Sequence, residues 1–143
     1  MSLRVLLLTN PETKKRLEQV LEQLVEREVA GKQGVEGKLI QMVHSNCKKL
    51  IPNILPRGIA HTLPFLLDDL EAEYVLAPTS FAQHLQRTDR RHFITKAIKR
   101  AFDRVVAQHP ILAPLYALIQ LRIEHHVALA LPQLAVVLRP FTG

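Results

Sequence analysis

Apolar side chains recur in this chain at the spacing of an α-helix, and this rhythm limits the folds open to it. Behind Asn10, aliphatic residues follow one another at intervals of three and four, with Glu, Lys and Arg between them. These residues are Leu17, Val20, Leu21, Leu24, Val25 and Val29. Only Leu3 to Leu8 has the pattern of a strand, and one strand makes no sheet. The sequence therefore predicts an all-α protein.

Capping residues predict where the first two helices begin and end. Asn10 is a good cap for a helix that starts at Pro11 and ends near Ala30-Gly31, where glycine permits a left-handed terminus. A second helix is expected from about Val35 to Leu50. Residues 52–56 are expected to form a connector, because each of their two prolines disfavours helix in the residue before it.

Three further helices are expected downstream. The third runs from Ile59 to about Glu73, and Pro64 inside it should kink it or mark a restart. Pro78-Thr79-Ser80 then offers a cap for a short helix through Gln86. The fifth helix is capped by Thr88 or Asp89 and stops at His109-Pro110.

The segment Ala113 to Leu131 is apolar on almost every side. A helix of this kind is buried in the centre of a bundle, in an oligomer interface or in lipid. After Pro132, residues 134–138 are expected to add another apolar turn or two. The chain is thus predicted to be one domain, residues 1–143, folded as a single compact bundle of about five to six helices.

Positive charge is concentrated in the second half of the chain. The net charge is +6; residues 1–75 carry ten Lys/Arg and ten Asp/Glu, whereas residues 76–143 carry nine and three. Most of the excess lies in one basic segment, whose cations are Arg87, Arg90, Arg91, Lys96, Lys99, Arg100 and Arg104. Such a stripe is a candidate anion or nucleic-acid contact. Against this, Asp103 lies on the same face and no aromatic side chains are interleaved to stack on bases.

Other chemistries find less support. Glu124-His125-His126 is the densest group of metal-ligand side chains, but neighbours on a helix point about 100° apart and cannot chelate one ion together. No cofactor or metal site is predicted. His44 and Cys47 are three residues apart, the minimum for an activated thiolate, but Cys47 falls in the apolar sector of its helix, where cysteine is an inert hydrophobe.

Gly34-x-x-Gly37 lies between two predicted helices with lysines on both sides, as in the backbone clamp of a KH domain. No strand pairs follow, and Glu36 would face the phosphate. In the alternative structural interpretation, Gly34 turns the chain and Gly37 lets the second helix approach the first closely.

The chain gives no sign of secretion. Its single cysteine, Cys47, cannot form an internal disulfide, and no signal-peptide pattern is present, so the cytoplasm is the expected location. The uncharged run from Val105 to Leu121 holds Pro110 and Pro114, which argues against one helix spanning a bilayer. Peripheral association with an anionic membrane surface stays open, with basic residues toward the headgroups and the apolar C-terminal third toward lipid.

Several short motifs are similar to those of a known family. They are Val29-Ala30 leading into Gly34-x-x-Gly37, Lys48-Lys49, Leu63-Pro64, Leu70-Glu71, His126-Val127 and Ala130-Leu131-Pro132-x-Leu134. Over residues 17–135 the chain resembles a family of small bacterial all-helical proteins, a domain of unknown function. The resemblance implies a helical fold and carries no activity or site with it.

These patterns favour a non-catalytic interaction or scaffold protein. The most unusual feature of the chain is its apolar surface, and no group of polar residues forms a recognisable catalytic or metal-binding motif. If the last helix is not covered within the monomer, its face would drive self-association, so a homodimer is predicted. The alternatives are nucleic-acid binding through residues 87–104 and peripheral membrane association. No small-molecule substrate is implied, and an enzyme ranks third.

Overall fold

The computed structural model describes residues 1–143 and contains helices but no strands, which confirms the all-α prediction. Nine α-helices are present rather than five to six, because short helices occupy the ends of the molecule. They are α1 (Leu3–Leu8), α2 (Pro11–Ala30), α3 (Gly34–Leu50), α4 (Ile54–Asp69), α5 (Glu71–Leu76), α6 (Phe81–His84), α7 (Arg91–Gln108), α8 (Ala113–Ala117) and α9 (Ile123–Thr142). Three 3-10 turns join them: η1 (Thr88–Arg90), η2 (Pro110–Leu112) and η3 (Gln120–Arg122).

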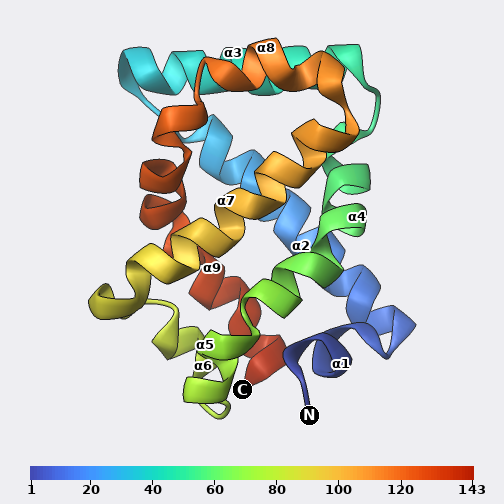
Figure 1. The fold of residues 1–143 in the computed structure, drawn as a ribbon, viewed down its shortest axis with the longest axis vertical. Coiled ribbons are helices and arrows are strands. Elements are labelled where there is room, and N and C mark those ends of the chain that lie inside the picture. The colour runs from blue at the N-terminus through green and yellow to red at the C-terminus, as the bar shows by residue number, and fades with distance from the viewer.

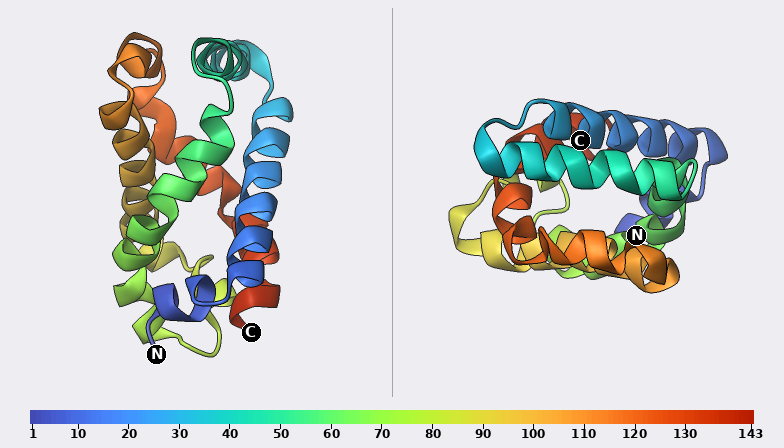
Figure 2. Two further views of the ribbon diagram at one scale, coloured as in Figure 1. Left: turned by 90° about the vertical axis from the view of Figure 1, so that its right-hand side faces the viewer. Right: turned by 90° about the horizontal axis from the view of Figure 1, so that it is seen from above.

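Four long helices form the sides of the bundle. In chain order, α2 contacts α4, α4 contacts α7, α7 contacts α9, and α9 closes the ring on α2. Successive members run alternately upward and downward in Figure 1, the arrangement of an antiparallel bundle. Two layers close the ends: α3 and α8 lie across one end, and α1, α5 and α6 gather with the C-terminus at the other (Figures 1 and 2).

The core runs the length of this bundle and includes residues from both chain ends. Its members are Leu3, Leu7, Leu17, Leu63, Leu67, Leu70, Phe81, Leu85, Ile94, Ala97, Tyr116, Ile123, Val127, Leu131 and Leu138. The strand-like segment at the N-terminus is helical, because Leu3 and Leu7 stand one turn apart and are both buried. The Ser2 hydroxyl caps it by accepting a hydrogen bond from Val5 N.

The first long helix starts as its cap predicts. Asn10 Oδ1 accepts hydrogen bonds from the backbone N–H groups of Glu12 and Thr13, and the helix ends at Ala30. The expected left-handed terminus at Gly31 is wrong, since Gly31 keeps a helical φ of −81° and the left-handed glycine is Gly34, at +75°. A side chain closes this end instead: the amide of Gln41 donates to the carbonyls of Val29, Ala30 and Lys32.

The predicted connector at residues 52–56 is too long. Asn53 takes a left-handed φ of 62°, and α4 begins directly after it. Pro56 then lies in the first turn, where its missing N–H is not needed. The helix passes through Pro64 and ends at Asp69, so the expected helix 59–73 is divided at Leu70 into α4 and α5.

The remaining boundaries differ at their ends. The short helix expected through Gln86 is limited to Phe81–His84, and Ser80 makes no side-chain cap bond. The fifth helix begins at Arg91 as α7, so the predicted cap at Thr88 or Asp89 is wrong: both lie in the turn η1, and the capping position is Arg90, which makes no side-chain cap bond. The helix ends at Gln108, directly before His109-Pro110, as predicted.

The largest correction concerns the segment Ala113 to Leu131, which is not one helix. It turns through η3, so that α8 lies across the end of the bundle while α9 descends along its side. Helix α9 continues past Pro132, because Leu131, Ala135 and Leu138 on its inner face are buried in the bundle. It forms one side of the ring rather than its centre, and therefore keeps an outward face.

Candidate interaction surfaces

The basic segment 87–104 lies on η1 and α7, and acidic side chains from the same chain neutralise most of it. The ion pairs are Arg87–Asp89 at 2.6 Å, Arg90–Glu73 at 2.6 Å, Lys99–Asp103 at 3.1 Å, Arg100–Asp69 at 3.9 Å and Arg104–Asp69 at 2.8 Å. Of the seven predicted contact residues, only Arg91 and Lys96 lack an acidic partner. The basic segment has the expected residues, but only two of its seven cations are unpaired.

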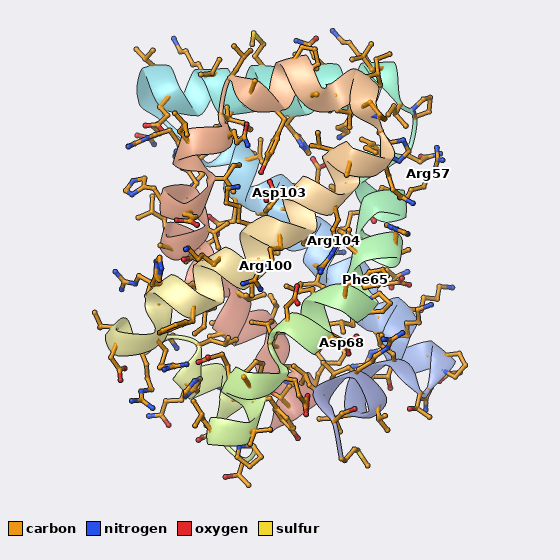
Figure 3. All side chains as sticks on the ribbon, viewed as in Figure 1. Arg57, Phe65, Asp68, Arg100, Asp103 and Arg104 are labelled. Carbon is orange, nitrogen blue, oxygen red and sulfur yellow. The ribbon has the colours of Figure 1, made fainter.

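These pairs tie α7 to its neighbours. Figure 3 shows Arg100 and Arg104 on α7 beside α4, where Arg104 lies 5.1 Å from the centre of the Phe65 ring while it binds Asp69. On the same helix, Asp103 accepts a hydrogen bond of 2.7 Å from the Tyr116 hydroxyl of α8. Burial, and then this hydrogen bond to a carboxylate, raise the pKa of the Tyr116 phenol.

A buried polar cluster joins the helices at the opposite end. Glu73 Oε1 lies 2.9 Å from His84 Nε2, and the guanidinium of Arg90 reaches both oxygens of Glu73 at 2.9 and 2.6 Å. Glu73 and His84 are both buried. The Arg90 hydrogen bond is the main cause that lowers the pKa of Glu73. Sequence reasoning missed this cluster, because no local spacing relates α5, α6 and η1.

The two glycines of Gly34-x-x-Gly37 have structural roles. Gly34 adopts the left-handed φ given above, and a Cβ on Gly37 would lie 2.8 Å from the backbone carbon of Lys32. The close approach is thus to the preceding loop, not to the first helix as predicted. Glu36 points to Arg122 Nε at 2.7 Å and His126 Nε2 at 3.0 Å. The hydrogen bonds from these two side chains, that from Arg122 first, lower the pKa of Glu36 to about 2.

The side chains of the other candidate sites also make contacts within the chain or are partly buried. His44 Nε2 lies 3.0 Å from Glu26 Oε1, and burial raises the pKa of the Cys47 thiol. The rings of His125 and His126 stand edge to face with centroids 5.3 Å apart. No three or more His, Cys, Asp or Glu side chains come together in the arrangement that a metal ion needs.

Two open hollows lie along α2. The first, about 310 Å³, lies between the C-terminal end of α2 and Gln133, with Leu24 as its one hydrophobic lining residue. The second, about 550 Å³, has no hydrophobic lining residue. Small-molecule sites are mostly apolar and concave, so neither hollow has the character of one.

The outer face of α9 is exposed and mostly apolar, and its polar side chains are those of His125 and Gln133. Leu129 is 57% exposed and Val136 is 60% exposed, and Pro132 and Pro140 lie on the same face. The segment Gln120–Thr142 is long and apolar enough to cross a membrane by length and composition alone. Only 28% of its most apolar stretch is buried inside the protein, and its inner face packs into the core.

A second exposed apolar surface lies at the end formed by residues 32–50 and 109–122, which we term the α3/α8 end. Its most exposed aliphatic side chains are Val35 at 89% and Leu121 at 94%. The others are Met42, Leu50, Ile111 and Leu118. The sequence drew attention to the apolar segment from Ala113 and, separately, to the lysines beside Gly34-x-x-Gly37, but it did not show that both lie at one end of the molecule.

Comparison with known proteins places the chain in a family. Residues 5–142 match the model of a family described as "Family of unknown function (DUF6918)", and the chain belongs to this family. No curated protein and no solved structure matches the chain. The resemblance expected from the short motifs is thereby confirmed as membership of a family that carries no assigned activity.

Proposed function

We propose that this member of the DUF6918 family is a non-catalytic helical interaction protein that pairs with a second copy of itself through the outer face of α9. The observation that carries the proposal is the absence of charge from residues 125–138, combined with the exposure of Leu129 and Val136 at the centre of that face. A soluble bundle ordinarily turns polar side chains outward on such a helix. An apolar outward face is the signature of an interface.

Charge complementarity favours a second copy as the partner. Glu124 and Arg139 flank the uncharged stretch on the same edge of α9, and neither forms an ion pair within the chain. When two identical helices pair antiparallel about a two-fold axis, equal edges meet. With the axis near residues 132–133, Leu129 of one copy faces Val136 of the other, and each Glu124 approaches an Arg139. A parallel pairing would leave these charges apart.

The size of the face sets the expected affinity. A stretch of 14 residues is about 21 Å long, at 1.5 Å per residue, and one helix face falls at the small end of stable interfaces. We therefore expect a reversible dimer with a dissociation constant on the order of micromolar. The cytoplasm, expected from the lone cysteine, remains the proposed location.

Nucleic-acid binding through residues 87–104 is the weaker alternative. Five of its seven cations are paired with four acids of the same chain, because Asp69 serves both Arg100 and Arg104. Arg91 and Lys96 have no acidic partner. Phosphate affinity grows with the number of cations available to displace counterions. A catalytic role has still less support, since the acid–base pairs at Glu73, Glu36 and Glu26 are internal contacts.

Sedimentation velocity between about 1 and 200 µM tests the pairing. The wild type should shift from monomer to dimer, while the double variant Leu129→Glu/Val136→Glu should remain monomeric with unchanged helical circular dichroism. Val75→Glu, a matched change at an exposed valine of α5, should dimerise like the wild type. A wild type that stays monomeric throughout, or a double variant that still dimerises, would overturn the proposal.

The orientation is tested by charge exchange. Glu124→Arg and Arg139→Glu should each weaken the dimer several-fold, because each places like charges together at both ends of the interface. The double exchange should restore pairing. If the wild type dimerises but the double exchange is weaker than either single variant, the antiparallel arrangement is wrong while the interface stands.

A further inference from the structure

We infer that the α3/α8 end of the bundle binds the surface of an anionic lipid membrane. The geometry of this end is the first observation. Helix α3 contacts both α8 and η2, and the view from above shows α3 and α8 lying side by side across the end of the four long helices (Figure 2). Two helices in one layer give a broad platform, the form in which amphipathic helices lie in a membrane interface.

The second observation is the set of aliphatic side chains on this platform. Val35 and Leu121 are almost fully in water, and Met42, Ile111 and Leu118 are exposed around them. These positions come from separate elements, α3 and the segment 109–122, so they are not one fraying terminus. Moving exposed aliphatic side chains from water into the boundary between headgroups and acyl chains lowers the free energy of the protein.

The third observation is charge. The α3/α8 end carries five cations, Lys32, Lys38, Lys48, Lys49 and Arg122, against one acid of its own, Glu36. Glu26 of α2 also pairs with Lys48 at 3.1 Å, which leaves a net charge of +3. Glu36 is already bound by Arg122 and His126. Lys38 and Lys49 have no acidic partner, and they share one face of α3 with Val35 and Met42. The lysines would contact the anionic headgroups of a lipid surface, and the aliphatic groups beside them would enter its apolar region.

This combination distinguishes lipid from nucleic acid. A nucleic acid would neutralise the lysines but would leave Leu121 and Val35 in water. Its bases stack on exposed aromatic rings, and the one aromatic residue of this end, Tyr116, is buried. In the basic segment 87–104 the unpaired cations are Arg91 and Lys96. The α3/α8 end has three, Lys32, Lys38 and Lys49, and it combines them with the most exposed aliphatic side chains of this end.

The inference does not depend on self-association. The α3/α8 end lies at the N-terminal end of α9, away from Leu129 and Val136, so a monomer presents it as fully as a dimer does. The double variant Leu129→Glu/Val136→Glu should therefore bind membranes like the wild type. Failure of dimerisation and failure of membrane binding are separate results.

Flotation of the full chain with vesicles provides the test. Vesicles of 70% phosphatidylcholine and 30% phosphatidylserine should carry the protein at low salt at least tenfold better than vesicles of phosphatidylcholine alone, and 0.5 M NaCl should reduce the binding strongly. Leu121→Glu and Lys38→Glu/Lys49→Glu should each abolish most of it. Because Leu121 is so exposed, its replacement should leave folding intact, and Leu121→Ser gives a milder second variant.

Two control variants introduce glutamate at exposed positions on other parts of the molecule. Val75→Glu and Lys96→Glu, at exposed positions outside the α3/α8 end, should leave vesicle binding unchanged. No binding to the anionic vesicles, equal binding to neutral ones, or full binding by the Leu121 and Lys38/Lys49 variants would overturn the inference. Binding to a short RNA or DNA duplex that is lost in the Lys38/Lys49 variant, without vesicle binding, would assign the surface to nucleic acid instead.

Discussion

Glu36 and His126 stand 90 residues apart in the chain, yet Glu36 Oε1 lies 3.0 Å from His126 Nε2. The same oxygen accepts a hydrogen bond of 2.7 Å from Arg122 Nε. The acid within the glycine motif and the histidine of Glu124-His125-His126 are therefore two halves of one contact. This contact joins the first turn of α3 to the start of α9 and fixes the α3/α8 end to the bundle.

The contact predicts how stability depends on acid. The folded state lowers the pKa of Glu36 to about 2 from an ordinary value near 4.5, so the stabilisation is fully present above pH 4.5 and is lost as the pH falls toward 2. Glu36→Gln should lower the urea midpoint at pH 7 and flatten its decline between pH 4.5 and 2. Glu22→Gln, an acid without an ion pair, serves as the control. Parallel pH profiles for Glu36→Gln and the wild type would contradict the assignment.

The buried cluster at the other end predicts a larger loss. Glu73→Gln keeps the shape of the side chain but leaves Arg90 without its counter-charge beside the buried His84. Breaking a buried ion pair by removing one partner costs about 3 kcal/mol or more. The matched change Asp89→Asn breaks the exposed pair with Arg87 and should cost far less, because solvent screens an ion pair at the surface. Urea denaturation at pH 7 measures both, and equal losses would show that burial of Glu73 does not matter.

The sequence predicts the fold correctly where neighbouring residues alone determine the structure. Asn10 and Pro11 predict the start of α2 correctly, because a cap acts on backbone groups two and three residues away. The all-α class follows from periodicity for the same reason. Pro56 misled the prediction, because the proline rule does not exclude the first turn of a helix, where Pro56 lies. At Pro64 the alternative of a restart is wrong, since α4 continues through it while packed against α2 and α7.

The sequence was insufficient where distant segments meet. A helical wheel places Lys96, Lys99 and Arg100 on one polar face, with Arg104 at its flank. It cannot show that Asp69 at the end of α4 arrives beside Arg100 and Arg104. The same limit hid the pairing of Arg90 with Glu73. The lysines beside Gly34-x-x-Gly37 were noted, but not their position next to the apolar residues of α8, because α3 and α8 are separated by more than 60 residues and meet only in the fold.

Cys47 gives a prediction about reactivity. Because burial raises the pKa of its thiol, alkylation by iodoacetamide at pH 7.5 should be several-fold slower than in the urea-unfolded chain, and the rate should still be rising above pH 9. His44→Ala should leave the rate unchanged, since His44 binds Glu26 instead of activating the thiol. A plateau near neutral pH that disappears in His44→Ala would instead establish a thiolate pair.

The loop between α2 and α3 gives a graded test with three glycines. Gly37→Ala should be the most damaging, because its Cβ would meet the Lys32 backbone at 2.8 Å and displace the loop that Gln41 holds against α2. We expect a loss of about 1–3 kcal/mol. Gly34→Ala forces a side chain into the left-handed region and should cost about 1–2 kcal/mol.

Gly31→Ala is the control for this series, because Gly31 has a helical φ and its nearest neighbour, Arg27 O, would lie 3.3 Å from the new Cβ. It should change stability by less than about 0.5 kcal/mol, as most surface changes do. In thermal unfolding, each kcal/mol corresponds to about 2–4 °C for a domain of this size. A melting temperature for Gly37→Ala at or above that of Gly31→Ala would mean that this loop does not require glycine, and the phosphate-clamp interpretation of the motif would have to be reopened.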